Sequence, residues 1–294
     1  MKNAICFGEV LWDVFPDQKK IGGAPLNVAL RLNALGVSAK VCSAVGKDKL
    51  GQEILHDLHQ VGLLTDLIQQ SEEHATGTVQ VTLDVKGSAS YTIKALVAWD
   101  YIEETKAAHH AVQKADVFVY GSLASRNQRT QATLKALLSK AKFRVFDVNL
   151  RPPHYDHSLL EEWMQAADFI KFNDDELYEI AKQLGSPYQA LDQHISYLAA
   201  HTNTPYICVT KGRHGAVFFT QGKFVYHSGY QVSVADTVGA GDSFLATLLE
   251  GILNQKPPEE SLQRACAMGA LVASKSGANP TITETELLRF IHGE

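Results

Sequence analysis

The chain has 294 residues, of which 45% are hydrophobic and 20% are charged, and its formal net charge is −5. This length and apolar content are enough for one large globular domain, whereas the mixed, acidic charge argues against a nucleic-acid-binding surface. No uncharged apolar run reaches the length of a membrane span, and the amino-terminus lacks the layout of a signal peptide. The four cysteines form no CxxC pair and are expected to be buried thiols (Cys6, Cys42, Cys208, Cys266). We therefore expect a cytoplasmic protein.

Short runs of β-branched and aromatic residues alternate with helical patterns along most of the chain. Strands are predicted at residues 4–7, 39–44, 117–120, 144–148, 169–172 and 206–209. Helices are predicted at residues 25–35, 50–61, 127–141, 174–184, 191–200, 241–253, 262–274 and 284–291. This alternation predicts an α/β fold with a mostly parallel central sheet covered by helices on both faces. Ligands of such sheets bind beyond the carboxyl ends of the strands.

Residues 76–97 depart from the alternation, since two strand-like runs, 78–85 and 89–97, are joined by a turn without an intervening helix. The two runs should pair antiparallel. With residues 11–21 they are expected to form a small sheet that acts as a lid, or alternatively to extend an edge of the main sheet. One hairpin cannot bury its alternating apolar side chains alone, which favours pairing with a second copy of the chain (Val79, Val81, Leu83, Tyr91, Ile93).

A glycine-rich turn, GGAPLN at residues 22–27, leads into the first long helix. Gly22 and Gly23 allow the backbone to approach a ligand closely, and Pro25 suits the first helical position. Asn27 offers a donor and an acceptor, as a pair of sugar hydroxyls would require, but a capping role explains it equally well. Asp13 follows the first strand and is either an acceptor for hydroxyl groups or a solvated turn residue.

The most informative stretch is DTVGAGDSF at residues 236–244, where a flexible loop opens onto a helix. The backbone N–H groups of Gly239, Ala240 and Gly241 can converge there on an anion. Asp242 lies in the first helical turn, where it would deprotonate a hydroxyl that attacks a phosphoryl group. The helix dipole should favour its ionised form and make it a weak base. An ordinary helix cap is the alternative. The chain has no P-loop motif, and the missing third glycine argues against a dinucleotide site.

GGAPLNVA at 22–29 and DTVGAGDSF at 236–244 together resemble the two signatures of the ribokinase-like (phosphofructokinase B) carbohydrate kinases. NDDE at 173–176 and TKGRHG at 210–215 are similar to further motifs of that family, in the same order. The resemblance spans essentially the whole chain. It implies one ribokinase-like domain, 1–294, with a lid formed by residues 11–21 and 76–101. GEVLWDVFP at 8–16 and DVNLRP at 147–152 look most like the bacterial fructokinases.

The resemblance implies a role for each matching residue. Asp242 resembles the catalytic base, and the anion hole for the γ-phosphate is matched by Gly239, Ala240 and Gly241. Sugar-contacting positions are matched by Asp13, Gly22, Gly23 and Asn27, while Arg151 is a candidate for a sugar oxygen, a phosphate or a structural ion pair. Positions around the nucleotide are matched by Asn173, Thr210, Lys211, Gly212 and Gly215. Glu176 matches a residue that holds Mg²⁺ through water, and a monovalent cation site, expected to take K⁺, is matched by Asp236, Val238, Gly277 and Thr281.

These matches predict an ATP-dependent kinase that phosphorylates a terminal hydroxyl of a monosaccharide, with D-fructose as the first choice. The alternatives within the class are 2-keto-3-deoxygluconate, ribose and nucleoside-like substrates. A catalytically silent, sugar-binding regulatory homologue is the alternative from another class, but the retained Asp242 and complete GAG loop argue against it. The resemblance also implies a homodimer that forms through the lid.

Overall fold

A nine-stranded sheet forms the centre of the computed structural model, which describes residues 1–83 and 89–294. Its strands run in the order β13-β12-β11-β10-β9-β8-β1-β4-β5. All neighbours from β11 to β5 pair parallel, while β12 and β13 add an antiparallel hairpin at one edge. The strands are β1 (Asn3–Phe7), β4 (Ser38–Gly46), β5 (Ile68–Ser71), β8 (Val117–Gly121), β9 (Arg144–Asp147), β10 (Phe169–Asn173), β11 (Tyr206–Thr210), β12 (Ala216–Thr220) and β13 (Lys223–His227).

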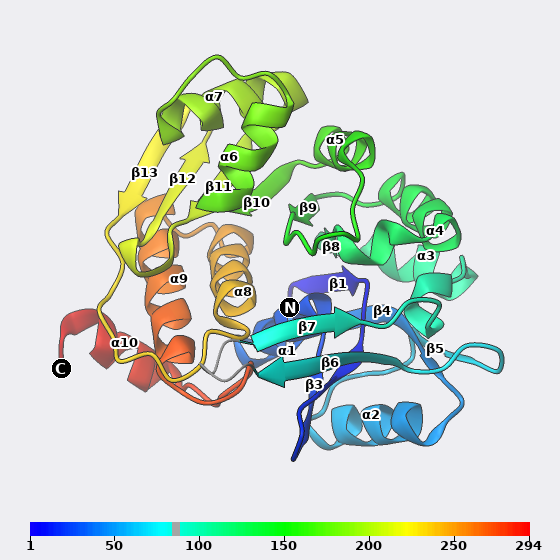
Figure 1. Ribbon diagram of the computed structural model, residues 1–294. Coiled ribbons are helices and arrows are strands. Elements are labelled where there is room, and N and C mark those ends of the chain that lie inside the picture. The colour runs from blue at the N-terminus through cyan, green and yellow to red at the C-terminus, as the bar shows by residue number, and fades with distance from the viewer. Residues whose placement is uncertain (84–88) are drawn as a thin grey trace.

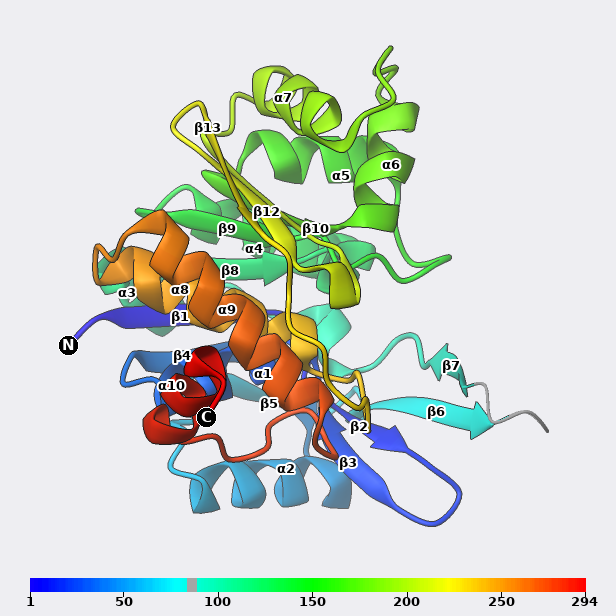
Figure 2. The same cartoon turned by 90° about the vertical axis from the view of Figure 1, so that its left-hand side faces the viewer.

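Helices cover both faces of this sheet, as the alternation of elements predicted (Figures 1 and 2). One face packs against α1 (Ala24–Ala34), α2 (Lys49–Gln60), α8 (Ala240–Leu253) and α9 (Pro258–Ala273). The other packs against α3 (Lys106–Lys114), α4 (Gln128–Leu138), α5 (His157–Gln165), α6 (Asp174–Gln183) and α7 (Leu191–Thr202). The last helix, α10 (Glu284–His292), lies against α9. Because both faces are covered, the central strands carry near-continuous apolar runs. Among the described residues, no helix has the length and apolar character that a bilayer crossing requires.

All the predicted strands and helices are present, but the sequence patterns missed β5, β12, β13, α3 and α5. The helix α3 buries only Ala108 and Val112, so its periodic signal is short and weak. It begins because Thr105 accepts a hydrogen bond from the Ala108 N–H. The strand β5 has the sequence IQQS, in which polar residues hide the strand pattern. Packing against the existing sheet decides the structure of these short segments.

A second, four-stranded sheet stands apart from the main one, in the order β3-β2-β6-β7 (Figure 1). It consists of β2 (Leu11–Val14), β3 (Lys19–Gly22), β6 (Gly77–Leu83) and β7 (Ala89–Ile93). The antiparallel pairing of β6 with β7 is confirmed, and the alternative that these residues extend the main sheet is wrong. The strand predicted at 89–97 ends earlier, at Ile93, and the turn predicted at 86–88 lies outside the described residues. Val79 of the expected apolar face is already buried, and Ile93 packs partly against the main core.

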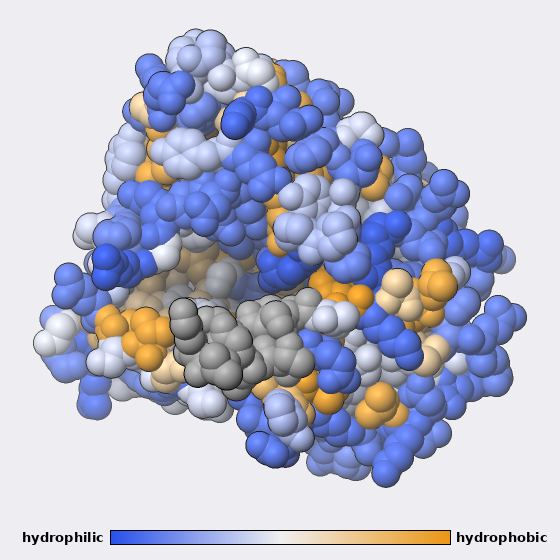
Figure 3. All heavy atoms as spheres, in the orientation of Figure 1, coloured by the Kyte–Doolittle hydropathy of each residue, from blue (hydrophilic) through white to orange (hydrophobic). Residues whose placement is uncertain are grey.

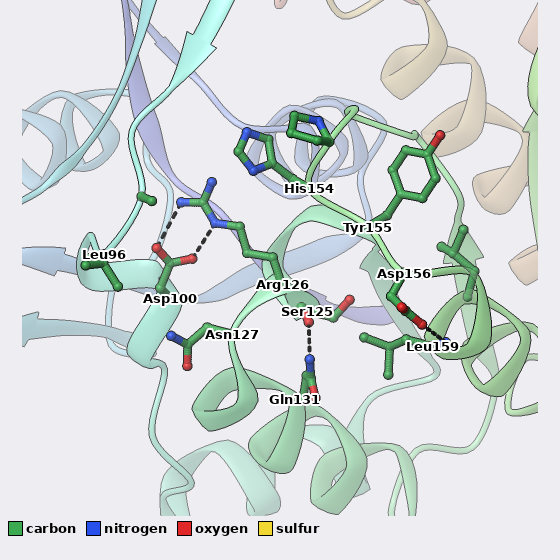
Figure 4. Close-up of a pocket in the computed structure, with 13 residues that line it drawn as sticks. Leu96, Asp100, Ser125, Arg126, Asn127, Gln131, His154, Tyr155, Asp156 and Leu159 are labelled. Carbon is green, nitrogen blue, oxygen red and sulfur yellow. Dashed lines mark hydrogen bonds and ion pairs between the residues drawn. The ribbon is translucent and has the colours of Figure 1, made fainter.

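The chain that leaves β7 is anchored to the main body by Arg126, at the end of the 3₁₀-helix η2 (Leu123–Arg126) (Figure 4). Its guanidinium donates to both oxygens of Asp100, at 2.7 and 2.9 Å, and to the carbonyl of Lys94 at 2.6 Å. It also lies 4.0 Å above the ring of Trp99, which is fully buried. These contacts form one wall of a hollow of about 350 Å³ beside the loop 153–156. These contacts therefore attach the small sheet to the main body at the edge of the main sheet where β8 and β9 end.

Candidate active site

The two glycine-rich turns singled out from the sequence meet where α1 packs against α8. The Asn27 Nδ2 atom donates a hydrogen bond of 2.8 Å to Asp242 Oδ2. Asn27 lies in the first turn of α1 and Asp242 in the first turn of α8, so two helix N-termini face one small region. The carboxyl ends of β9, β10 and β11 lie at the same edge, as the doubly covered sheet predicted.

The helix α8 begins at a residue that must be glycine. Gly239 has φ of +76°, and a Cβ placed on it would lie 2.3 Å from the carbonyl oxygen of Ala278. No side chain caps this helix, so its first N–H groups are offered to an external acceptor. One of the three expected donors is already engaged, since the Ala240 N–H donates to the Thr237 carbonyl at 3.3 Å. The predicted anion hole thus has one of its three N–H groups occupied by a backbone carbonyl.

Burial determines the acidity of Asp242. Burial and, to a smaller extent, the charge of Asp147 raise the pKa of this carboxyl to about 6, although the hydrogen bond from Asn27 and the charges of Lys171 and Arg151 oppose the rise. The expectation of a low pKa from the helix dipole is therefore wrong. A carboxylate with a pKa near 6 is ionised at neutral pH and is a better proton acceptor than a free aspartate.

Lys171 is a functional candidate that the sequence reasoning missed. Its Nζ atom donates to Asp147 Oδ1 at 2.9 Å, and both residues are almost completely buried. A Cβ on Gly241 would lie 3.4 Å from Nζ, so the ammonium group sits beside the predicted anion hole. Burial alone would lower the pKa of Lys171, but the charges of Asp147 and Glu176 outweigh it and raise the pKa above its usual value. The sequence did contain a signal for Lys171, because a lysine is unusual within a strand whose two faces are both covered.

The residues predicted to contact the sugar also lie at this edge of the sheet. The carboxylate of Asp13 occupies the space beside Gly22, where a Cβ would lie 2.3 Å from Asp13 Oδ2. Burial raises the pKa of Asp13 to about 6, and the charge of Arg151 opposes this rise. The Arg151 Nη1 atom donates to the neighbouring Leu150 carbonyl at 2.9 Å, and within residues 1–83 and 89–294 the guanidinium has no carboxylate partner. Gly23, with φ of +118°, lies against the Glu9 carbonyl, where a Cβ would clash at 2.3 Å.

A hollow of about 950 Å³ adjoins the start of α8 and extends between the loop after β11 and the helix α9. Figure 3 shows this face of the molecule hollowed near its middle. Of the predicted nucleotide residues, Thr210, Gly212 and Gly215 line it, together with Ala240 and Gly241. Lys211 and Asn173 are not among its lining residues. The Asn173 side chain instead caps α6 by accepting from the Glu176 N–H at 2.8 Å.

Glu176 is nearly buried, and both of its oxygens accept backbone hydrogen bonds, from Leu150 N–H at 2.9 Å and Asn173 N–H at 2.8 Å. Each oxygen keeps a further lone pair. In the described part of the chain, Asp147 Oδ2 is buried without a hydrogen-bond partner, and no three acidic, histidine or cysteine side chains are arranged to enclose a metal. Mg²⁺ usually keeps several waters and needs one or two carboxylates when phosphates supply the rest. Asp147 and Glu176 fit such a hydrated ion.

Asp236 connects the two segments predicted to hold a monovalent cation. Its Oδ1 atom accepts from the Val238 N–H at 3.0 Å, and its Oδ2 atom accepts from the Gly277 N–H at 3.1 Å. The carbonyl of Thr281 accepts from Lys275 Nζ at 3.3 Å, so an ammonium group already contacts one of the predicted cation ligands. The structure thus brings Asp236, Val238 and Gly277 together next to Gly239, and the cation site itself stays a prediction.

Comparison with known proteins shows the class of protein that this fold and site define. Residues 2–285 match the model of the pfkB family carbohydrate kinases. The chain is 29% identical over 307 residues to the fructokinase of Vibrio alginolyticus, an alignment that covers 97% of each protein.

Two solved structures share the fold. The fructokinase of Xylella fastidiosa with bound ATP superimposes with a TM-score of 0.87 at 23% identity, over 99% of this chain and 98% of that one. A double mutant of the Vibrio cholerae fructokinase, bound to fructose, ADP and potassium, gives a TM-score of 0.84 at 24% identity, with the same coverage. The fold is ribokinase-like, as predicted. The chain belongs to the pfkB family of carbohydrate kinases.

The Lys171–Asp147 ion pair gives a prediction about stability. Lys171→Met should lower the free energy of unfolding by about 3–5 kcal/mol, because it leaves the Asp147 carboxylate buried without its partner. Urea titration measures the change. The double variant Lys171→Met/Asp147→Leu should recover part of the loss, and Lys182→Met, on the exposed side of α6, serves as the matched control. A Lys171 variant as stable as the control would show that the pair contributes nothing to folding.

Proposed function

We propose that the chain is an ATP-dependent fructokinase, which transfers the γ-phosphate of ATP to a terminal hydroxyl of D-fructose. The observation that carries the proposal is the contact of Asn27 with Asp242 at 2.8 Å, because it joins the sugar motif to the acid beside the anion loop. The fructokinase names of the relatives support the choice of sugar. The cytoplasmic location expected from the sequence is part of the same proposal.

In the proposed reaction, Asp13, Asn27 and Arg151 hold the sugar so that its terminal hydroxyl faces Asp242. The carboxylate accepts the hydroxyl proton as the oxygen attacks the γ-phosphorus, and ADP leaves. The free N–H groups at the start of α8 and the Lys171 ammonium group stabilise charge on the transferred phosphoryl group. Mg²⁺, held by Asp147 and Glu176 through water, would neutralise charge on the β- and γ-phosphates.

The nucleotide is assigned to the hollow of about 950 Å³ beside the start of α8. Thr210 ends β11, Gly212 and Gly215 come from the loop that follows it, and Gly241 reaches the hollow from α8. This arrangement would bring the γ-phosphate to the anion loop from one side while the sugar arrives from the side of α1. Sugar and phosphate donor would then meet at Asp242.

A coupled ADP-release assay with a panel of sugars and ATP tests the function. D-Fructose should give the highest kcat/KM, and Asp242→Asn should lower kcat by about 10²–10⁴-fold with little change in sugar affinity. Asn is nearly isosteric with Asp, so the fold should be kept, and unfolding of the variant by urea checks this.

Other outcomes of this assay would contradict the sugar, the catalytic activity or the role of Asp242. Faster turnover of 2-keto-3-deoxygluconate, ribose or a nucleoside would contradict fructose as the substrate. Turnover of none of them, with sugar binding intact, would favour a regulatory sugar-binding protein. An Asp242→Asn variant within a few-fold of wild type would remove Asp242 as the base.

Potassium should activate the enzyme relative to buffer that contains only sodium or tetramethylammonium. The physical reason is that a cation held by carbonyls near Asp236 would order the loop that carries the anion hole. Initial rates in each buffer measure the effect. Lys275→Met should strengthen the dependence, since it removes the ammonium group that contacts the Thr281 carbonyl. Equal rates in potassium-free buffer would exclude the cation from the mechanism.

We also propose a homodimer that forms through the small sheet, which would then close over the sugar as a lid. Wild-type protein should sediment at about twice the chain mass of 32.2 kDa at micromolar concentration. Ile93→Glu should weaken the dimer and raise the KM for the sugar, whereas Thr92→Glu, at the adjacent exposed position on the opposite face of β7, should not. A monomeric wild type would contradict the dimer, and the apolar face would then have to be buried within one chain.

A further inference from the structure

A chain of hydrogen bonds extends from the loop 277–281 to Asp242. The Asn279 Nδ2 atom donates to Asn27 Oδ1 at 2.7 Å, and Asn27 Nδ2 donates to Asp242 Oδ2 at 2.8 Å. The three side chains come from the loop before α10, from α1 and from α8. No sequence motif indicated a role for Asn279.

The contacts allow only one orientation of the Asn27 amide. Asp242 offers an acceptor, so the NH₂ group of Asn27 must face it, and the Oδ1 atom must then face Asn279. A donor at position 279 stabilises this orientation. An acceptor there would favour the reverse orientation, in which Asn27 presents its oxygen to the carboxylate of Asp242.

Independent contacts hold the loop that carries Asn279. The buried Arg31 donates from Nη2 to the Pro280 carbonyl at 2.9 Å and from Nε to Ser243 Oγ at 3.1 Å. Asp236 accepts from the Gly277 N–H at 3.1 Å. Asn279 itself is exposed, so replacing its side chain removes little packing. The loop should therefore keep its position in variants of this one residue.

We propose that Asn279 is a positioning residue for phosphoryl transfer, which orients the Asn27 amide so that its NH₂ group faces the proton-accepting carboxylate of Asp242. The inference rests on the proposed function of Asp242 as the base. Asn279 acts only through Asn27. Its contribution is to keep the base ionised and its Oδ2 atom fixed, while the other oxygen faces the incoming hydroxyl.

The electrostatic surroundings of Asp242 make this orientation consequential. Asp147 from β9 raises the pKa of Asp242 beyond the effect of burial, and Lys171 from β10 and Arg151 from the following loop lower it. Glu9, after β1, is a further buried carboxyl near Asp242, and burial raises the pKa of Glu9 to about 7. The hydrogen bond from Asn27 also lowers the pKa of Asp242, and it is the one of these influences that a rotation of an amide can reverse.

The test compares Asn279→Asp, Asn279→Ala and Asn279→Gln. The aspartate has nearly the same size but cannot donate to Asn27 Oδ1, so the Asn27 amide should rotate and the acidic limb of kcat/KM should move up by about one pH unit. If the wild-type acidic limb is centred near pH 6, kcat/KM of this variant should be ~5-fold lower than that of wild type at pH 6 and nearly equal to it at pH 8.5. Alanine leaves Asn27 free to keep its contact with Asp242 and should shift the limb less, and glutamine restores a donor and should resemble wild type.

A purely structural role gives a different result. Truncation to alanine would then be at least as damaging as aspartate, and the loss would be the same at all pH values. Either observation would overturn the proposal. Asn254→Ala, at the exposed far end of α8, is the control and should leave the pH profile unchanged.

A second measurement separates this inference from the proposed function. The ¹³C chemical shift of the Asp242 carboxyl, followed against pH in protein without sugar or nucleotide, reports its pKa directly. A higher pKa in Asn279→Asp supports the positioning role even if no sugar in the panel is phosphorylated. An unchanged pKa in this variant overturns it, even if the wild-type enzyme phosphorylates fructose rapidly.

Discussion

The convergence of helix N-termini at one edge of the parallel sheet is the constraint on which the rest of the site depends. The helices α1, α6 and α8 all begin there, next to the last residues of β9 and β10. Their dipoles place partial positive charge in one small volume, which favours anions. Acidic side chains therefore gather at the same edge, where the charge of Asp147 raises the pKa values of Asp242 and Glu176. The buried ammonium group of Lys171 offsets this repulsion, and in the proposed reaction it would also stabilise the charge of the transferred phosphoryl group.

The architecture could be predicted from the sequence because its signals are local. Apolar runs marked the central strands, helical periodicity marked the long helices, and the absence of a helix between β6 and β7 marked the second sheet. Segments with only two or three buried residues, such as α3, have too few regularly spaced apolar residues to be recognised as helices or strands. Their structure depends on the surface that the rest of the chain offers them.

The sequence singled out most residues of the candidate site, but it could not predict their contacts. Asn27 and Asp242 stood out because glycines and helix starts surround them, yet nothing in either motif says that the two side chains touch. Lys171 and Asn279 lie beside residues that the motifs singled out, but no motif assigns a role to either of them, and only the folded chain brings their side chains next to Gly241 and Asn27. The expected pKa of Asp242 was wrong for the same reason. The helix dipole is visible in the sequence, whereas burial and the proximity of Asp147 arise from residues far apart in the chain.

The contact of Gly22 with Asp13 limits the order in which the proposed sugar site can change. The Asp13 carboxylate fills the volume that a side chain at position 22 would need, so any larger residue at 22 must displace it. A variant that gains a side chain at 22 first would lose the placement of Asp13 before any new selectivity could arise. Replacement of Asp13 by a smaller residue must come first or at the same time. Evolution or engineering of a new sugar preference at these two positions therefore cannot begin with a larger residue at position 22.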